Sequence, residues 1–163
     1  GGGLPLAALV ASVEIMQHFD KEIVGADKWL MQLGTLSGNP IAATAGLKTM
    51  EILRRGGSYE KLRNIGKALQ DVQSDALTKA GVPHQICGDE TLFDIFFTAS
   101  TCRDYRSAKH DDPAQNATYN AALRKHGIFK SPGKLYPSLA VTEADLDHTR
   151  DAVRQAVRTT FLD

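Results

Sequence analysis

The chain has 163 residues, 42% of them hydrophobic, which is enough to bury a core of about one domain. Lys plus Arg and Asp plus Glu each number 19, so the balanced charge gives no sign of a nucleic-acid or anionic-membrane surface. No apolar run approaches the about 20 residues that span a bilayer. Residues 4–16 are apolar, but Glu14 interrupts them and no basic segment precedes them, so we do not expect a signal peptide.

The first third of the chain predicts one well-defined helix. Residues 20–32 are polar and are expected to form a loop. Asn39 and Pro40 then predict a helix start, because Asn caps free backbone amides and Pro suits the first helical position, where its missing N–H costs nothing. We expect this helix to end at the glycines of residues 56–57.

The remaining residues predict alternating helices and strands. A helix capped by Ser58 carries apolar residues at steps of three and four, and Gly81 ends it. After it we expect, in order, strands at 82–87 and 92–99, a loop at 100–112, and a helix from Asp112-Pro113 to about Gly127. A short strand at 128–129, a turn at 131–133 and a short strand at 139–141 then follow. Thr142 and Asp145 resemble a capping box, which begins a final amphipathic helix.

This order of elements predicts an α/β fold. From about residue 56 onward, paired strands with helices on one face indicate a small α/β sandwich. Residues 1–55 hold too few elements to close a core and are expected to form the edge of a larger domain. The glycines at residues 1–3 have no Met before them, which indicates the inside of a longer polypeptide.

The segment from Gly34 to Pro40 carries the clearest chemical signal. A Gly-Thr loop that runs into a helix N-terminus offers backbone donors, a hydroxyl and the positive end of the helix dipole, which together suit a phosphate group. A well-capped helix with no ligand would produce the same spacing, so the pattern by itself leaves both interpretations open.

The full strings resemble a known family. GTLSGNPIAATAG, at residues 34–46, is similar nearly residue for residue to a segment of class III (fold type I) aminotransferases that depend on pyridoxal 5'-phosphate (PLP), above all the glutamate-1-semialdehyde aminomutases. GGGLP, at residues 1–5, resembles the segment that follows the PLP-binding lysine in that family. The resemblance implies that residues 1–55 are the C-terminal edge of the PLP-binding large domain. It also implies that residues 56–163 are the small C-terminal α/β domain.

The resemblance also implies site residues. The threonine that matches Thr35 bonds the PLP phosphate of the neighbouring subunit in a homodimer, so Thr35 and the backbone of Gly34 are the expected cofactor-binding residues. The Schiff-base lysine of the family lies a few residues before GGGLP, so no catalytic residue is expected in this chain. The implied activity is transfer of an amino group between an amino acid or amine and a carbonyl acceptor.

Two departures from the aminomutase pattern favour an ordinary aminotransferase. Residues 6–11 read LAALVA instead of a glycine-rich stretch with a tyrosine, and residues 134–138 read KLYPS instead of a Tyr-Glu-Ala-Gly run. Lys134, or nearby Lys130, could meet a substrate carboxylate as a point charge, although a solvated surface lysine is the alternative for each. Glutamate-1-semialdehyde 2,1-aminomutase remains a second hypothesis, and a non-catalytic α/β binding or oligomerisation domain a third.

The metal-binding residue types give no site. The five histidines are scattered, and Cys87 and Cys102 lack metal-ligand spacing, so we expect no metal site. A reduced cysteine pair in a cytoplasmic protein is the expected state, with a disulfide as the alternative.

Overall fold

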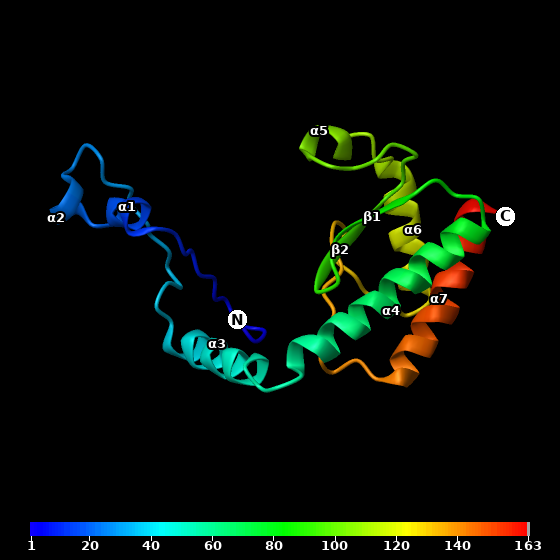
Figure 1. The fold of residues 1–163 in the computed structure, drawn as a ribbon, viewed down its shortest axis with the longest axis horizontal. Helices are drawn as coiled ribbons and strands as arrows, with labels where there is room; N and C mark the ends of the chain where they lie inside the picture. Colours follow the sequence, from blue (N-terminus) through cyan, green and yellow to red (C-terminus); the bar gives the residue numbers. More distant parts are fainter. Residues whose placement is uncertain (163) are drawn as a thin grey trace. The chain divides into compact units, whose positions relative to one another are not determined.

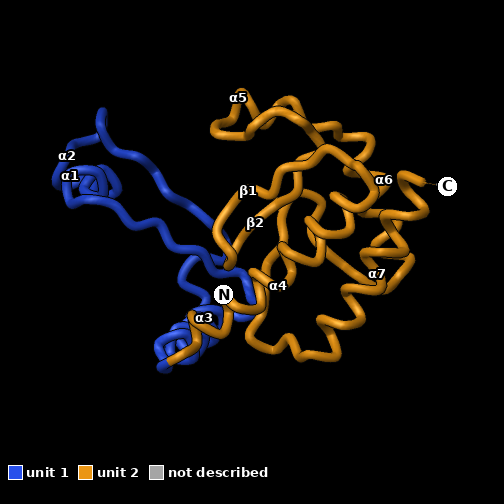
Figure 2. Tube along the Cα trace, turned by 45° about the vertical axis from the view of Figure 1, so that its right-hand side comes forward, with its two compact units in different colours: residues 1–56 blue, residues 57–163 orange. Residues whose placement is uncertain are grey.

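A computed structural model describes residues 1–162 of the chain, which divides into two compact units. The first unit is Gly1–Gly56 and the second is Gly57–Asp163, coloured blue and orange in Figure 2. This division falls next to the boundary expected at residues 55 and 56. The assignment of the first unit to the edge of a larger PLP-binding domain stays a prediction.

The first unit is built from short helical turns and one longer helix (Figure 1). Its elements are α1 (Val13–Met16), a 3₁₀ turn η1 (Gln17–Phe19), α2 (Lys21–Val24) and α3 (Pro40–Leu53). The loop expected at residues 20–32 is therefore partly helical. The Asp20 side chain caps α2 by accepting from the backbone amide of Glu22, and the Trp29 indole N–H donates to Phe19 O at 3.2 Å. These local bonds order a polar stretch that has no hydrophobic periodicity.

Helix α3 begins where the sequence predicts it. The Asn39 side-chain oxygen accepts from the amides of Ile41 and Ala42 at 3.0 and 3.1 Å, and Pro40 is the first helical residue. The helix ends at Leu53, just before the glycines of residues 56–57. The predicted cap and proline signal is thus confirmed.

The second unit is a mixed α/β fold, as predicted (Figure 1). Its elements are α4 (Ser58–Lys79), β1 (Gln85–Asp89), β2 (Leu92–Phe96), α5 (Tyr105–Ala108), α6 (Pro113–Lys125) and α7 (Glu143–Phe161). β1 and β2 form an antiparallel hairpin in which Cys87 lies opposite Asp94. The predicted capping box of Thr142 and Asp145 is confirmed at the start of α7.

Three local predictions in this unit are wrong. The N-cap of α4 is Gly57, which adopts the left-handed conformation at φ +80°, and Ser58 is the first helical residue. Residues 128–129 and 139–141 are not strands. The segment that pairs with β2 on its other side is instead the one around Leu135. The Leu135 amide donates to Phe93 O at 2.7 Å. Single-turn helix α5 lies within the expected loop, held by a capping box between Asp104 and Ser107.

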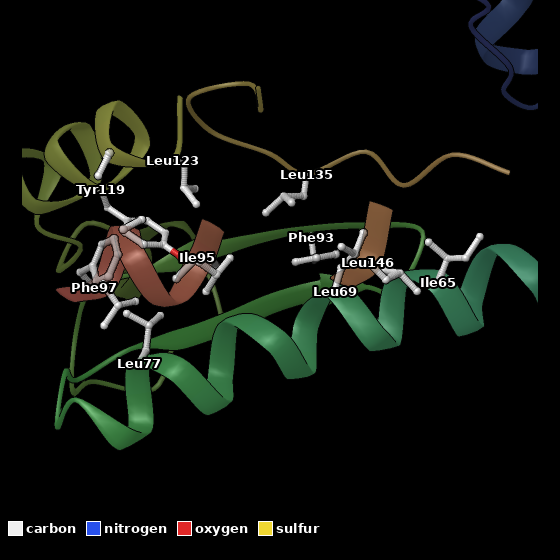
Figure 3. Packing of buried hydrophobic residues seen from close by; sticks show 14 residues of the cluster. Ile65, Leu69, Leu77, Phe93, Ile95, Phe97, Tyr119, Leu123, Leu135 and Leu146 are labelled. Atoms are coloured by element: carbon white, nitrogen blue, oxygen red, sulfur yellow. The ribbon is translucent and has the colours of Figure 1, made fainter. Parts of the chain in front are cut away.

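A hydrophobic core fills the second unit (Figure 3). Alternation along β2 turns Phe93 and Ile95 into this core, and both are 1% exposed. Helices α4, α6 and α7 supply most of the other buried residues, among them Leu69, Leu77, Tyr119, Leu123 and Val153. Figure 3 shows Phe97 beside Tyr119, with ring centroids 5.5 Å apart and edge to face. Each such large apolar side chain contributes about 1.5–3 kcal/mol when fully buried.

Candidate functional site

The loop before α3 consists of two successive turns. The Ser37 amide donates to Gly34 O at 2.9 Å, and the Asn39 amide donates to Leu36 O at 3.2 Å. Gly38, at φ +72°, makes the second turn possible because side-chain-bearing residues rarely adopt that conformation. These two turns give the loop a defined conformation directly before the N-terminus of α3.

The free donors of this loop lie before the helix and not at its first turn. Asn39 already accepts from the first two helical amides, and its carbonyl accepts from the amide of Ala43 at 2.9 Å. The donors that could meet a phosphate are therefore those of the loop itself, and the cofactor site at Thr35 and Gly34 stays a prediction. Within the described residues, the amides of Thr35, Leu36 and Gly38 donate no hydrogen bond.

Thr35 is exposed, and its hydroxyl has no hydrogen-bond partner in the part of the chain that the structure describes. Gly34 contributes its backbone, and a Cβ there would come within 2.6 Å of the Ser37 hydroxyl oxygen. The Ser37 hydroxyl therefore lies close to the loop backbone. This donor set of hydroxyls and amides fits a phosphate, since an anionic oxygen gains charge-assisted bonds from both.

An apolar depression of about 820 Å³ borders the loop within the first unit. Leu6, Leu9, Met16 and Phe19 line it together with residues 34–38. Apolar walls with a few placed donors are typical of sites for small molecules and cofactors.

The two segments that carry the family resemblance pack against each other in this unit. Gly2 and Gly3 have φ of +61° and +85°, and the amide of Leu4 closes a turn on Gly1 O at 3.1 Å. A Cβ at Gly2 would lie 3.2 Å from Ala45 O on α3, so a larger residue does not fit there. Gly2 thus allows close approach of the GGGLP turn to α3.

Lys134 and Lys130, the two candidate substrate-binding cations, have opposite environments. Lys134 is exposed in a tight turn closed by the Ser131–Lys134 bridge. The side chain of Lys130 is 4% exposed and lies 3.6 Å from Asp94 Oδ1. Burial lowers the pKa of Lys130 and raises the pKa of Asp94. Of these two lysines, Lys134 is the one that a ligand from solvent can reach.

Sequence reasoning overlooked Asp94. Its signal was a single acidic residue inside the apolar strand LFDIFF, where a charge is costly unless it has a partner. No group of three or more His, Cys, Asp and Glu side chains within residues 1–162 could hold a metal ion. In the same residues, no helix combines the length and apolar character of a membrane span.

The mixed α/β fold of this chain is that of part of a fold type I PLP-dependent transferase. The chain belongs to the Aminotransferase class-III family, whose profile matches residues 1–157. The similarity covers nearly the whole chain and includes both units.

Individual proteins that are similar to this chain are an aminomutase and transaminases. The chain is 34% identical to glutamate-1-semialdehyde 2,1-aminomutase 2 of Brevibacillus brevis over 99% of its own length and 37% of that protein. It is similar to the structure of an omega-transaminase from Sphaerobacter thermophilus, with a TM-score of 0.71 and 28% identity over 90% of this chain and 34% of that one. A beta-phenylalanine aminotransferase from Variovorax paradoxus gives 0.63 and 25% identity over 88% and 33%. The chain thus spans about a third of the length of these relatives.

Proposed function

We propose that this chain acts as the C-terminal part of a PLP-dependent aminotransferase that moves an amino group between an amino acid or amine and a carbonyl acceptor. Family membership and the two transaminase structures at 25% identity or more support this activity. The observation that carries the proposal is the unpaired Thr35 hydroxyl among free loop amides, beside an apolar depression.

Thr35 and the backbone of Gly34 would hold the phosphate of PLP, in a homodimer whose cofactor sites are shared across subunits. When bound, PLP supplies an electron sink for the carbon that loses or gains a proton. This chain's own part is to bind and orient: the loop holds the anionic end of the cofactor, and Lys134 meets a substrate carboxylate as a point charge. The Schiff-base lysine is expected on a segment that precedes Gly1. The proposal includes a cytoplasmic location, in keeping with only two cysteines, Cys87 and Cys102.

The aminomutase hypothesis retains specific support from the Brevibacillus relative at 34% identity. Against it stands the KLYPS sequence at residues 134–138, which has no acid. Product analysis separates the two reactions. With the PLP-loaded enzyme and no added keto acid, intramolecular transfer proceeds, whereas two-substrate transamination stops after the amino group has been taken up.

The cofactor assignment is tested by Thr35→Ala in the full-length protein. Loss of one charge-assisted hydroxyl bond should weaken PLP retention about tenfold, measured by equilibrium dialysis and by the visible absorption of bound cofactor. Thr35→Ser, which keeps the hydroxyl, should retain most of the affinity.

Thr44→Ala is the matched control, because the Thr44 hydroxyl bonds Pro40 O at 2.8 Å inside α3 and is not a free donor. PLP affinity that is the same in Thr35→Ala as in the unmodified protein would refute the site assignment. If neither variant nor the unmodified protein retains PLP, the proposed function itself fails.

A further inference from the structure

The ammonium group of Lys130 is held by three oxygen atoms in the second unit. Asp94 Oδ1 lies 3.6 Å away, and Lys130 Nζ donates to Ser131 O at 3.0 Å and to Pro132 O at 3.4 Å. With a side chain only 4% exposed, this cation is almost removed from water. Two of its three contacts are carbonyls of the loop that follows it.

Asp94 lies on β2 and points to the face opposite the core residues Phe93 and Ile95. Its side chain is 15% exposed, and its Oδ1 also accepts from the amide of Ile95 at 2.9 Å. The position of a Cβ at Gly133 would be 3.9 Å from Asp94 Oδ2, so the turn lies next to the carboxylate. The carboxylate and the ammonium thus tie β2 to the loop.

We expect the ion pair to contribute little net stability to the fold. Burial is the largest influence on both groups, raising the pKa of Asp94 and lowering that of Lys130 in spite of their mutual attraction. Each shift opposes the charged form, so desolvation outweighs the attraction between the partners. The contacts of the pair therefore point to a role in fixing the conformation of the loop, because Lys130 bonds two of its carbonyls and pairs with Asp94 on β2.

Two further contacts converge on the same loop. Asn120 Nδ2 on α6 donates to Pro132 O at 3.2 Å, and the amide of Leu135 donates to Phe93 O at 2.7 Å. Lys134 lies between these anchors and Tyr136 directly follows them, and both side chains are exposed. A rigid frame therefore presents two exposed side chains capable of ionic, hydrogen-bonding and aromatic contacts.

We infer that Asp94 and Lys130 are positioning residues that fix the loop from Ser131 to Tyr136 and thereby set how Lys134 and Tyr136 meet a substrate that carries a carboxylate. The inference rests on the proposed function for its substrate, and on the contacts of the buried pair for its mechanism. Lys130 is thus assigned to the frame of the site, and Lys134 to the surface that the substrate meets.

The test uses the full-length, PLP-loaded protein and replaces the pair in two ways. Lys130→Met leaves Asp94 buried without its partner, and should lower the urea midpoint of unfolding. The double variant Asp94→Leu/Lys130→Met removes both charges, and its urea midpoint should return to about that of the unmodified protein. Lys125→Met, an exposed lysine on α6, is the matched control for loss of a positive charge.

Hydrogen exchange at the Leu135 amide reports on the loop itself. In the double variant this amide should exchange about tenfold faster although the urea midpoint has recovered, because the loop has lost its fixed conformation. In the double variant, KM for a carboxylate-bearing amino donor should rise about tenfold while kcat for that donor stays nearly unchanged. KM for an amine that lacks a carboxylate should also stay nearly unchanged.

Unchanged Leu135 exchange and unchanged KM in the double variant would overturn the inference. Exchange does not depend on activity, so an inactive protein with faster Leu135 exchange would count against the proposed function while it supports the positioning of the loop. Faster exchange without any change in KM would overturn the link to the substrate.

Discussion

At the scale of single residues, Asp89, the last residue of β1, has a carboxyl whose pKa is lowered by the hydrogen bonds that it accepts. The Thr91 amide donates to Asp89 Oδ1 at 3.0 Å and Arg63 Nη1 donates to Oδ2 at 2.6 Å, and together they lower the pKa of Asp89 to about 2. Because the folded pKa lies below the unfolded value, the stabilisation is complete above the unfolded pKa and is lost as the pH falls through about 2. We expect Asp89→Asn to destabilise the protein at neutral pH and to have no effect on its stability below a pH of about 2.

The measurement is urea unfolding of the protein and of Asp89→Asn across a pH series, with the Asp89 carboxyl followed by NMR. Arg63→Met should raise the titration midpoint only part of the way, since the Thr91 amide is the larger cause. A gap between the two proteins that stays constant down to the lowest pH would contradict this account.

At the scale of elements, α4 and the β1–β2 hairpin meet at Gly66. A Cβ at this position would lie 1.7 Å from Glu90 O and 2.6 Å from Glu90 C, and both are backbone atoms. Ala is the better helix former by about 1 kcal/mol, yet Gly66→Ala should destabilise the protein by about 1–3 kcal/mol because the helix and the turn must move apart. Thermal or urea unfolding measures the change.

Asn64→Ala, at an exposed position on the same helix, is the control and should stabilise the protein by a few tenths of a kcal/mol. Equal stabilisation by both substitutions would show that the contact between α4 and the turn is loose.

The same scale explains what the sequence predicts well and what it does not. Caps such as Asn39 and Thr142 act on backbone groups within three residues, so their signals are complete in the local sequence. The pairing of Phe93 with Leu135 depends on how the chain returns after α6, and no local signal distinguishes it from the strands expected at 128–129 and 139–141. Propensity there yields to tertiary contacts.

The candidate site divides in the same way. The motif around Thr35 can be read in the sequence, but its free donors cannot, because only the structure shows that Asn39 occupies the first amides of α3. The local sequence does not distinguish Lys130 from Lys134, because both are lysines in the same polar loop. Burial beside Asp94 distinguishes them, and that burial depends on a strand about 36 residues earlier in the chain.

At the scale of the whole molecule, the two units differ in how much apolar surface they bury. In the first unit, which is described in full, only Ala42 and Gly46 are buried, whereas Val10, Val13 and Leu33 are 88, 81 and 77% exposed. The second unit encloses the hydrophobic core. Since burial of apolar area is the main favourable contribution to folding, the second unit has its own driving force and the first does not.

We therefore expect residues 57–163 to fold alone and residues 1–56 not to. Calorimetry of the second unit should give one cooperative transition with an unfolding enthalpy of about 70 kcal/mol near 60 °C, whereas residues 1–56 should give none. Leu77→Ala, at a fully buried position on α4, should cost the isolated second unit about 2–5 kcal/mol because it leaves a cavity in the core. A second unit that binds hydrophobic dyes and unfolds without cooperativity would contradict this expectation. It would show that the hydrophobic core of the second unit is incomplete when the unit is alone.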